Sequence, residues 1–465
     1  MTGWNLESSI IIPIKNNNWQ LISIQSSVLG QAIRNMASAG IGHYDVVVFG
    51  ATGFTGQYVV EEVARVAQLE DKKWTAPFTW AVAGRSENKL RAALTTATKQ
   101  TGLSVDNVGV IKADVGDQES LNKMAAQSTV IINCVGPYQL YGEQVVRACI
   151  ENGASHIDIS GEPQFLEGMQ LKYNKAAEEA GVYIVGACGY DSIPAEIGLV
   201  HMIKNFKGEL NSAQMYVRVK SASGAVIHTG TMESAALSIA NGAEIATIRR
   251  KLFPERLPKP KYKVAKKGRV HKNDELGIWG VSLPTDEPVV YRTQHFRHSV
   301  LSQRPIQFQQ FVGLRSFFQA AGLLIGMAYF ALISYFSWTR KLLLKYPEVM
   351  TAGAFKRSGA SRKALKKVKF TATLLGQGWS QSLLEGSDQS TQPPDSSIIV
   401  KVAGPDPGYG ATSLMMVASA VTILRQNHLC PGRGGVLTPG AAFANTDIIA
   451  RMEERGMTVS VQDQK

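Results

Sequence analysis

Short apolar runs and amphipathic stretches alternate over the first half of the chain. Runs rich in β-branched residues predict buried strands at positions 44–49, 79–82, 108–112, 130–134, 157–159 and 183–185. Apolar residues at helical spacing predict helices between these strands, at positions 57–68, 87–99, 119–126, 142–152 and 163–180. Regular alternation of buried strands with helices is typical of an α/β fold built on a doubly wound parallel sheet.

The pattern changes after about residue 193. Alternating apolar and polar residues predict half-exposed strands, and other stretches keep helical spacing. Strands are expected at 214–221, 367–375 and 398–403, and helices at 232–241 and 414–425. This mixture predicts a second domain with a mixed α/β fold.

One segment of this second half, residues 317–338, carries no charged residue. As a helix it would extend about 33 Å, enough to cross the roughly 30 Å hydrocarbon core of a bilayer. We expect it to associate with a membrane as a re-entrant hairpin bent near Gly322 or Gly326, because a single crossing would separate two halves of one domain. A buried core helix and an interface in a homodimer are the competing interpretations.

Composition narrows the class of protein. Hydrophobic residues make up 45% of the 465 positions and charged residues 18%, which excludes a largely disordered chain. Four cysteines without a C-x-x-C pair argue against a disulfide scaffold and a zinc knuckle, and favour a reducing compartment. Residues 1–40 are rich in serine and asparagine and resemble neither a signal peptide nor a convincing transit peptide, so we expect an extension outside the fold.

The net charge of +12 points to an anionic partner, and one segment carries most of the excess. Between Arg249 and Lys272 eleven basic residues accompany one acid, Glu255. A solvated loop and a segment facing anionic headgroups both fit this composition. Nucleic-acid binding is not expected, because Tyr262 alone interrupts the basic run with an aromatic ring.

A glycine-rich motif between a predicted strand and a predicted helix is the strongest chemical signal. It consists of Gly50, Ala51, Thr52, Gly53, Phe54, Thr55 and Gly56. In dinucleotide-binding folds the first glycine permits a tight turn, the second lets the backbone approach a pyrophosphate, and the third allows close helix packing. The positive end of the helix then faces the phosphates. This motif predicts a dinucleotide site.

The end of the next strand indicates which dinucleotide is bound. NAD sites usually place an acid there, to bind the ribose 2′-hydroxyl. Here the strand ends in Gly84, followed by Arg85 and Ser86. A guanidinium and a hydroxyl suit a 2′-phosphate, so NADP(H) is favoured over NAD(H), with Arg85 as a solvated loop residue the alternative.

Further candidates follow the later strands on the same rim. Asp114 is placed either to contact the adenine or to cap a loop. Asn133 and Gly136 lie on the nicotinamide side of the crevice, because ligands bind outside the carboxyl ends of parallel strands. Tyr138 and Asp191 are weak catalytic candidates: Tyr138 as a proton donor or an interfacial aromatic, and Asp191 as a rim residue or a helix cap with a neighbouring serine. No metal-binding or nucleophile motif is present in the sequence.

Several of these segments closely resemble the saccharopine dehydrogenase-like oxidoreductases, relatives of saccharopine reductase and of bacterial trans-acting enoyl reductases. The resemblance is carried by VVVFGATGFTGQYV, AGRSENKL, NCVGPYQLYGEQVVRAC, HIDISGE, GYDSIPAEIG and GRGGVLTPGAAF. It implies a Rossmann domain over 41–192, an inserted second α/β domain over 193–428 with the apolar segment, and a C-terminal segment, 429–465, that packs back on the first domain. It also implies association with membranes and lipid droplets.

The sequence therefore predicts an NADPH-dependent oxidoreductase that acts on a lipid-like or apolar substrate at a membrane or lipid-droplet surface. The expected location is the cytosolic face, with the mitochondrion as the alternative. A membrane-surface protein that binds a nucleotide without turning over a substrate is the other function that these features allow. Since the resemblance is carried by cofactor motifs, it does not identify the substrate.

Overall fold

The computed structural model describes residues 9–14, 18–23, 43–73, 77–221, 226–382 and 390–464. The chain divides into two units, Met1–Tyr44 and Asp45–Lys465. In the first unit, strands β1 (Ser9–Ile14) and β2 (Asn18–Ser23) pair as an antiparallel hairpin. The rest of the extension expected at 1–40 lies outside the described residues.

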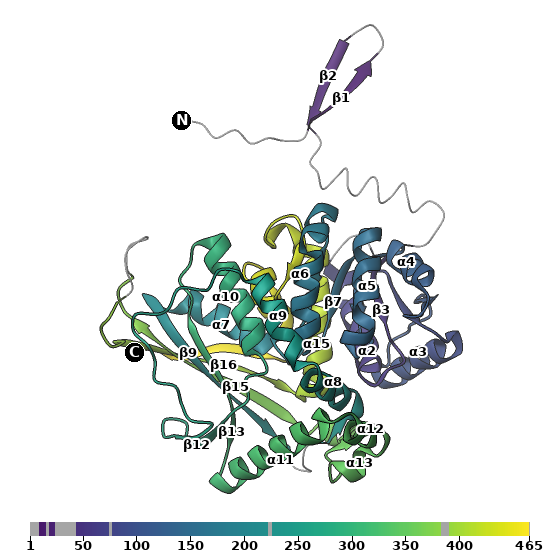
Figure 1. The fold of residues 1–465 in the computed structure, drawn as a ribbon. Helices are drawn as coiled ribbons and strands as arrows, with labels where there is room; N and C mark the ends of the chain where they lie inside the picture. Colours follow the sequence, from purple (N-terminus) through teal and green to yellow (C-terminus); the bar gives the residue numbers. More distant parts are fainter. Residues whose placement is uncertain are drawn as a thin grey trace. The chain divides into compact units, whose positions relative to one another are not determined.

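The second unit contains a seven-stranded sheet with the order β17-β8-β7-β6-β3-β4-β5. Its strands are β3 (Tyr44–Phe49), β4 (Trp80–Gly84), β5 (Gly109–Lys112), β6 (Ser128–Asn133), β7 (Ser155–Asp158), β8 (Tyr183–Val185) and β17 (Gly435–Leu437). Strands β3 and β7 of this sheet are labelled in Figure 1. The pairs β17–β8, β8–β7, β7–β6, β3–β4 and β4–β5 all run parallel. Chain order reverses between β3 and β6, which is where doubly wound sheets bind ligands.

The helices of this half follow the predicted alternation. They are α2 (Phe54–Lys73), α3 (Glu87–Thr101), α4 (Gln118–Ala126), α5 (Tyr138–Asn152) and α6 (Pro163–Ala180). Helix α5 starts four residues before the predicted position, because Glu162 binds its first turn: the carboxylate accepts the N–H groups of Tyr138 and Gln139 at 2.9 and 2.8 Å. The doubly wound parallel sheet is confirmed.

A second, mostly antiparallel sheet has the order β11-β12-β13-β9-β15-β16-β18. Its strands are β9 (Glu209–Lys220), β11 (Val270–Asn273), β12 (Ile278–Ser282), β13 (Gln307–Leu314), β15 (Lys369–Trp379), β16 (Ser396–Pro405) and β18 (Thr458–Gln464). Strands β9 and β13 pair in parallel. Helix α7 (Ile193–Asn205) leads from the first sheet into this one. The mixed α/β character predicted for the second half is therefore confirmed.

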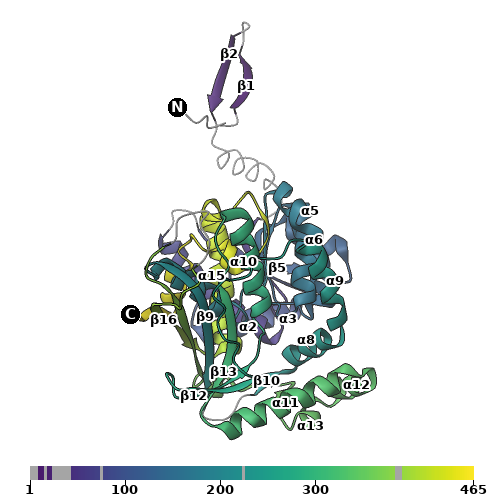
Figure 2. The same ribbon diagram turned by 60° about the vertical axis from the view of Figure 1, so that its left-hand side comes forward.

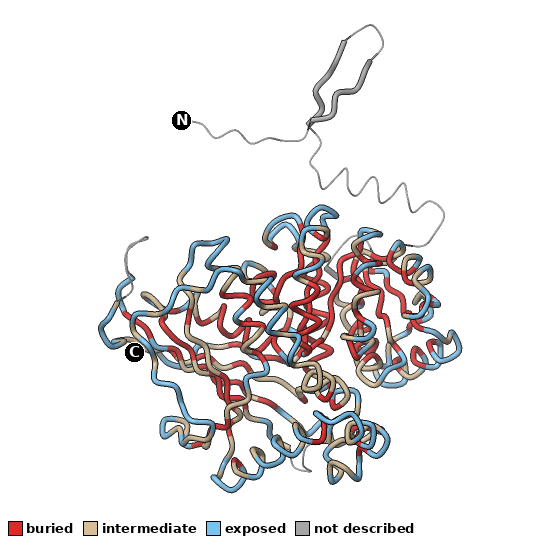
Figure 3. Tube along the Cα trace, in the orientation of Figure 1, coloured by how far each residue is buried: buried red, intermediate tan, exposed pale blue. Residues whose placement is uncertain are grey.

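The C-terminal part of the chain contacts both sheets. Helix α15 (Thr412–Gln426) packs against α2 and against strands β6 and β7. Strand β17 then joins the edge of the first sheet beside β8, and β18 joins the second sheet beside β16. One cluster of buried apolar side chains runs through both sheets, and Figure 3 shows the buried residues concentrated along them.

Helices α8 (Thr229–Ala240), α9 (Gly242–Leu252), α10 (Glu287–Leu301), α11 (Phe317–Tyr335), α12 (Ser337–Lys345) and α13 (Pro347–Met350) lie outside the two sheets (Figure 2). Helix α9 packs on α6, and α11 and α12 pack on α8. The short strands β10 (Ile227–His228) and β14 (Phe355–Lys356) pair beside α8.

Most of the apolar segment, Phe317–Tyr335, forms the continuous helix α11, which passes straight through Gly322 and Gly326. The helix ends with Phe336 as its C-cap, and Trp338 belongs to α12. The hairpin bend expected at the two glycines was wrong. A Cβ added to either glycine would meet no atom within 4 Å, so neither marks a close approach or a turn. Of its apolar window only 17% is buried, whereas the other helix of similar length and hydropathy, Pro407–Leu429, is 78% buried and belongs to the core.

Candidate functional site

The glycine-rich turn links β3 to α2 at the rim where chain order reverses. Gly50 adopts φ +82°, a left-handed conformation that favours glycine, and its N–H donates to the Ala83 carbonyl at 3.0 Å. A Cβ on Gly56 would press far inside the contact distance of the Gly50 carbonyl. Ala51 and Gly56 are buried, whereas Thr52 and Gly53 are exposed. The exposed surface of the turn is therefore main chain. The N–H groups in the first turn of α2 come next, and they have no preceding helical turn whose carbonyl groups could accept them.

This geometry fits the pyrophosphate of a dinucleotide. Gly53 is the residue at which backbone can come closest, because any side chain there would project from the exposed side of the turn. Thr55 is the second residue of α2 and is half-buried. The positive end of a twenty-residue helix faces the same point.

The side chain of Phe54 contacts protein. Its ring stacks on His228 with centroids 4.9 Å apart and meets Tyr409 edge-on at 4.6 Å. On the next helical turn, Tyr58 carries the guanidinium of Arg362 over its ring at 4.5 Å. The start of α2 is thus fastened to β10 and to the segment before α15. Sequence reasoning missed this contact because its partners lie far apart in the chain.

Arg85 and Ser86 lie where the 2′-phosphate was predicted to bind. Arg85 is exposed, and Ser86 precedes α3 without using its hydroxyl as a helix cap. Among the residues that the structure describes, no hydrogen bond engages either side chain, so both can donate to a ligand at the end of β4. This arrangement fits a phosphate monoester at the N-terminus of α3, where the helix dipole adds to the attraction.

Replacing Arg85 by alanine is expected to weaken NADP+ binding and leave NAD+ binding nearly unchanged. A hydrogen bond to a charged group contributes about 1.5–3 kcal/mol, so the loss should be roughly 10- to 150-fold. Calorimetric titration of both nucleotides against wild type and variant measures it. Lys89→Ala removes an exposed cation one turn further along α3 and serves as the control. Equal affinity of the wild type for both nucleotides would contradict the assignment.

The remaining predicted cofactor residues differ in whether they present side-chain or main-chain atoms to the crevice. Asp114 is half-buried and accepts the N–H of Gly116 at 3.0 Å, the loop-capping arrangement that was the alternative to adenine contact. The side chain of Asn133 is buried, where it accepts the Val135 N–H at 3.0 Å and contacts His156 at 3.3 Å. Gly136 is exposed at the rim. Asn133 therefore offers the crevice no side-chain atom, whereas Gly136 offers backbone.

The two weak catalytic candidates have different surroundings. Tyr138 is buried, its hydroxyl donates to the Asn133 carbonyl at 2.9 Å, and its ring packs against Phe165. Burial raises its pKa well above the usual value. Asp191 keeps exposed surface on the loop after β8, while the protein around it desolvates the carboxyl and raises its pKa to about 6. Only Asp191 offers a titratable group to a ligand.

A buried carboxyl that the sequence analysis missed lies behind Asp191. Asp286 accepts the hydroxyl of Ser192 and the amide of Gln310, each at 2.9 Å. Its pKa is raised well above the usual value by burial first and by the charge on Asp191 second. The Thr-Asp-Glu-Pro sequence at 285–288 is typical of an ordinary helix start. It therefore does not indicate that Asp286 lies close to Asp191 and Ser192.

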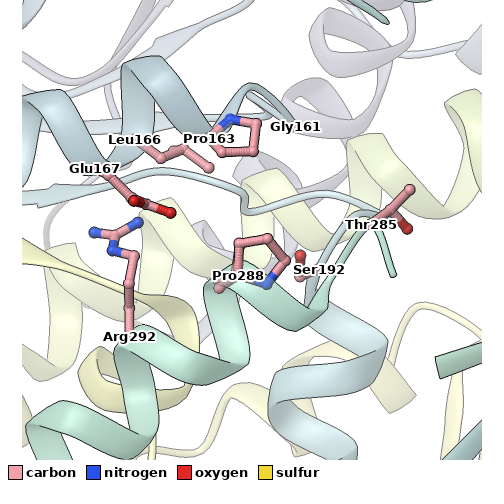
Figure 4. A pocket seen from close by; sticks show the side chains of 9 residues that line it. Gly161, Pro163, Leu166, Glu167, Ser192, Thr285, Pro288 and Arg292 are labelled. Carbon is pink, nitrogen blue, oxygen red and sulfur yellow. The ribbon is translucent and has the colours of Figure 1, made fainter. Parts of the chain in front are cut away.

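Ser192 also lines a small pocket between the start of α6 and α10, shown in Figure 4. The guanidinium of Arg292 and the carboxylate of Glu167 face each other there (Figure 4). Glu167 is held by Arg249 through contacts of 2.8–3.0 Å, and Arg292 donates to Gln170 at 2.6 Å. Burial lowers the pKa of Arg292 to about 10. These charges balance one another inside the protein and hold α6, α9 and α10 together.

The remaining groups to consider are the cysteine thiols and side chains that could bind a metal ion. The four cysteines are free, and burial raises the pKa of all four thiols. In the part of the chain that the structure describes, no group of three or more histidine, cysteine or carboxylate side chains is placed to hold a metal ion.

Comparison with known proteins agrees with this geometry. Residues 46–185 match the family model "Saccharopine dehydrogenase NADP binding domain". The chain is 40% identical over 426 residues to the human "Saccharopine dehydrogenase-like oxidoreductase", covering 90% of this chain and 97% of that one. It is 38% identical over 432 residues to the "Lipid droplet localized protein" of Caenorhabditis elegans, covering 91% and 99%.

The fold also matches that of a solved structure. Saccharopine dehydrogenase (L-Glu forming) from Saccharomyces cerevisiae aligns with a TM-score of 0.50 at 12% identity, covering 90% of this chain and 100% of that one. This likeness concerns the fold alone. With the exposed glycine turn, the free donors after β4 and the matches over nearly the whole chain, the protein belongs to the saccharopine dehydrogenase-like oxidoreductase family and has NADP(H) as its cofactor.

Proposed function

We propose that this oxidoreductase reduces a lipid-like substrate with NADPH while α11 lies on the surface of a membrane or lipid droplet. NADPH supplies a hydride in such reactions. The observation that carries the proposal is the exposed apolar side of α11 and the residues that follow it, here named the α11 surface. It comprises Phe318, Ile325, Tyr329, Leu332, Tyr335, Phe336, Trp338 and Val349.

The α11 surface has the features of a helix that lies in a lipid interface. Phe318, Ile325 and Leu332 recur every seven residues and so share one side, with exposures of 85, 69 and 60%. The opposite side is anchored, since Ile333 packs with Met232 of α8 and Leu343 of α12. A helix held along one side and apolar along the other suits shallow insertion parallel to the surface. Trp338 and Lys341 at its end suit the headgroup level.

Helix α8 connects the α11 surface to the rim of the crevice. Met232 and Ala236 contact α11 and α12 from one side of α8. From its other side, Ser238 accepts hydrogen bonds from Gln139 at 3.2 Å and Gln164 at 2.9 Å. Gln139 and Gln164 begin α5 and α6, at the carboxyl ends of the sheet strands. A substrate dissolved in the lipid would thus be separated from the crevice by one helix.

The basic segment supports a role at an anionic surface only in part. Arg249 is used internally in its ion pair with Glu167, whereas Lys266, Lys267 and Arg269 are exposed just before β11. Strand β11 pairs with β12, whose Trp279 meets Phe317 of α11 at 5.1 Å. These cations therefore lie two strands from the start of α11. Each would add about 1 kcal/mol to the free energy of binding at an anionic surface.

Flotation and turnover test the proposal together. The protein is mixed with phosphatidylcholine vesicles, with or without phosphatidylserine, and with a triacylglycerol emulsion coated by phosphatidylcholine. NADPH oxidation is then followed with long-chain aldehydes, ketones and enoyl esters and with their short-chain homologues. We expect co-flotation and turnover of the long-chain compounds. A protein that stays in the dense fraction without detergent, or prefers short chains, would contradict the proposal, and a dimer in that fraction would assign the α11 surface to a second copy.

A further inference from the structure

We infer that Asp191 is the catalytic acid of the reduction, the group that gives a proton to the substrate atom next to the carbon that receives the hydride. The inference rests on the proposed function for the direction of the reaction and goes beyond it in naming the residue.

The loop that carries Asp191 is fixed from three elements. Asp158, at the end of β7, accepts the N–H groups of Ala187 at 3.3 Å and Cys188 at 2.8 Å. The hydroxyl of Thr412, in α15, accepts the Tyr190 N–H at 3.1 Å. On the other side of Asp191, Ser192 donates to Asp286 at the start of α10. The backbone of Asp191 is therefore positioned on both sides.

These contacts do not involve the carboxylate of Asp191. In the described part of the chain no ion pair or hydrogen bond engages the Asp191 side chain, and the residue keeps exposed surface. Oδ2 lies 4.0 Å from where a Cβ on Gly161 would stand, in the loop after β7. The carboxylate therefore lies near the loop that follows β7, whose next residue, Glu162, binds the start of α5. This is the nicotinamide half of a doubly wound crevice.

Most of the other titratable groups on this rim are already occupied, and burial raises the pKa of the Cys134 thiol to about 12. Tyr138 donates to a main-chain carbonyl, and the ring of Tyr190 packs edge-on against Phe370 at 5.0 Å. Asp158 and Glu162 are buried and accept main-chain N–H groups. Glu233 on α8 is the one half-buried acid that remains near the rim, and burial followed by the charge of Glu162 raises its pKa. Glu233 is therefore the rival to be tested.

The surroundings suit a carboxyl that holds a proton near neutral pH. Desolvation raises the pKa of Asp191 to about 6. The titratable groups facing it are acids: Asp286 from the start of α10 and Tyr190 from its own loop, and the pKa of each is raised, first by burial and then by the charge of Asp191. A carboxyl whose pKa is raised toward neutral holds its proton more readily at the working pH, as general acid catalysis requires.

The step balances without a further reagent. The substrate double bond, C=O, C=N or C=C, opens as its carbon gains the hydride, and a new C–H bond forms. The electron pair of the broken π bond takes the proton of the Asp191 carboxyl at the other atom. The carboxylate regains a proton from water through its exposed side, and bound NADPH would supply the two electrons with the hydride.

Carbodiimide labelling tests the inference without any substrate. Dicyclohexylcarbodiimide adds to protonated carboxyls, and peptide mass spectrometry locates the adduct. Labelling of Asp191 should rise as pH falls, with a midpoint near 6, and saturating NADP+ should reduce it at least fivefold. Asp274 is the control, because its 2.7 Å ion pair with Lys272 lowers its pKa and should keep it unlabelled above pH 6. A midpoint near 4, or labelling indifferent to NADP+, would overturn the inference and leave the family assignment untouched.

Turnover gives the second measurement. With any carbonyl or enoyl compound that the wild type reduces, Asp191→Asn should lower the rate at least 100-fold at unchanged NADP+ affinity, and Asp191→Glu should recover part of it. Asp274→Asn makes the same replacement on the exposed turn between β11 and β12 and should change nothing. Loss in Glu233→Gln with an active Asp191→Asn would assign the acid to α8 instead. Absence of turnover in the wild type would count against the proposed substrate class, while the labelling would still decide the role of Asp191.

Discussion

Replacement of Gly53 by valine is expected to abolish NADP+ binding and to leave the fold intact. A Cβ at this position would lie 3.2 Å from the Gly50 carbonyl, which a small backbone shift accommodates, but the two methyl groups beyond it would occupy the space of the pyrophosphate. Loss of two charge-assisted hydrogen bonds at about 1.5–3 kcal/mol each lowers affinity more than 100-fold. Calorimetric titration with NADP+ and a thermal melt measure the two effects.

Two glycine variants provide the comparison for Gly53→Val. In Gly56→Ala the new methyl group would press into the Gly50 carbonyl, so both the melting temperature and NADP+ affinity should fall. In Gly168→Ala, on α6, the Cβ would meet nothing within 4 Å, and both should stay as in the wild type. Near-normal NADP+ affinity in Gly53→Val would show that the glycine serves the turn alone and that the phosphates bind elsewhere.

The triple replacement Phe318→Asp, Ile325→Asp and Leu332→Asp is expected to release the protein from lipid surfaces. Burying each of these side chains in an acyl region contributes about 1.5–3 kcal/mol, and a carboxylate in its place is repelled by anionic headgroups. The loss should exceed 100-fold in partitioning. Because all three are exposed, the melting temperature should hardly change. Flotation with phosphatidylcholine vesicles that contain phosphatidylserine and a thermal melt provide the measurements.

Two single variants separate docking from folding. Val300→Asp, on α10, replaces an apolar side chain that is 60% exposed and should float like the wild type. Ile333→Asp places a charge in the cluster between α8, α11 and α12, so it should lower the melting temperature by several degrees. Unchanged flotation of the triple variant would remove the α11 surface from any role in docking.

Local patterns were enough to predict most of the first sheet. Strand β8 and helix α6 have the predicted bounds, because each is delimited by its own glycines and prolines. The glycine turn likewise carries its signal within seven residues. The start of α5 was missed by four residues since its cap, Glu162, comes 24 positions after Tyr138. Strand β17 has three residues and depends on its neighbour β8 for its conformation.

The candidate site was predictable only where chemistry follows a strand directly. Arg85 follows β4 directly, and Asp191 lies on the loop that follows β8; both were predicted from their position alone. Asp286 reaches the site because α10 packs beside α7, and no local pattern reports a contact between residues 94 positions apart. The hairpin bend predicted in the apolar segment was wrong for a related reason. Glycines such as Gly322 and Gly326 permit a bend, but the packing of α11 on α8 favours a helix that continues through both.

The last strand of the first sheet also bears on how the protein is made. When a ribosome has released β8, the outer edge of that strand has no partner until residues 435–437 emerge some 250 positions later. Val182 then accepts the Gly435 N–H at 2.9 Å, and Glu196 accepts that of Gly440 at 2.6 Å. Until that moment a nascent chain exposes a strand edge and part of an apolar core, the surfaces that promote aggregation. Messages that stop translation before codon 435 should therefore yield a chain that is degraded, even though every residue of its glycine turn has been synthesised.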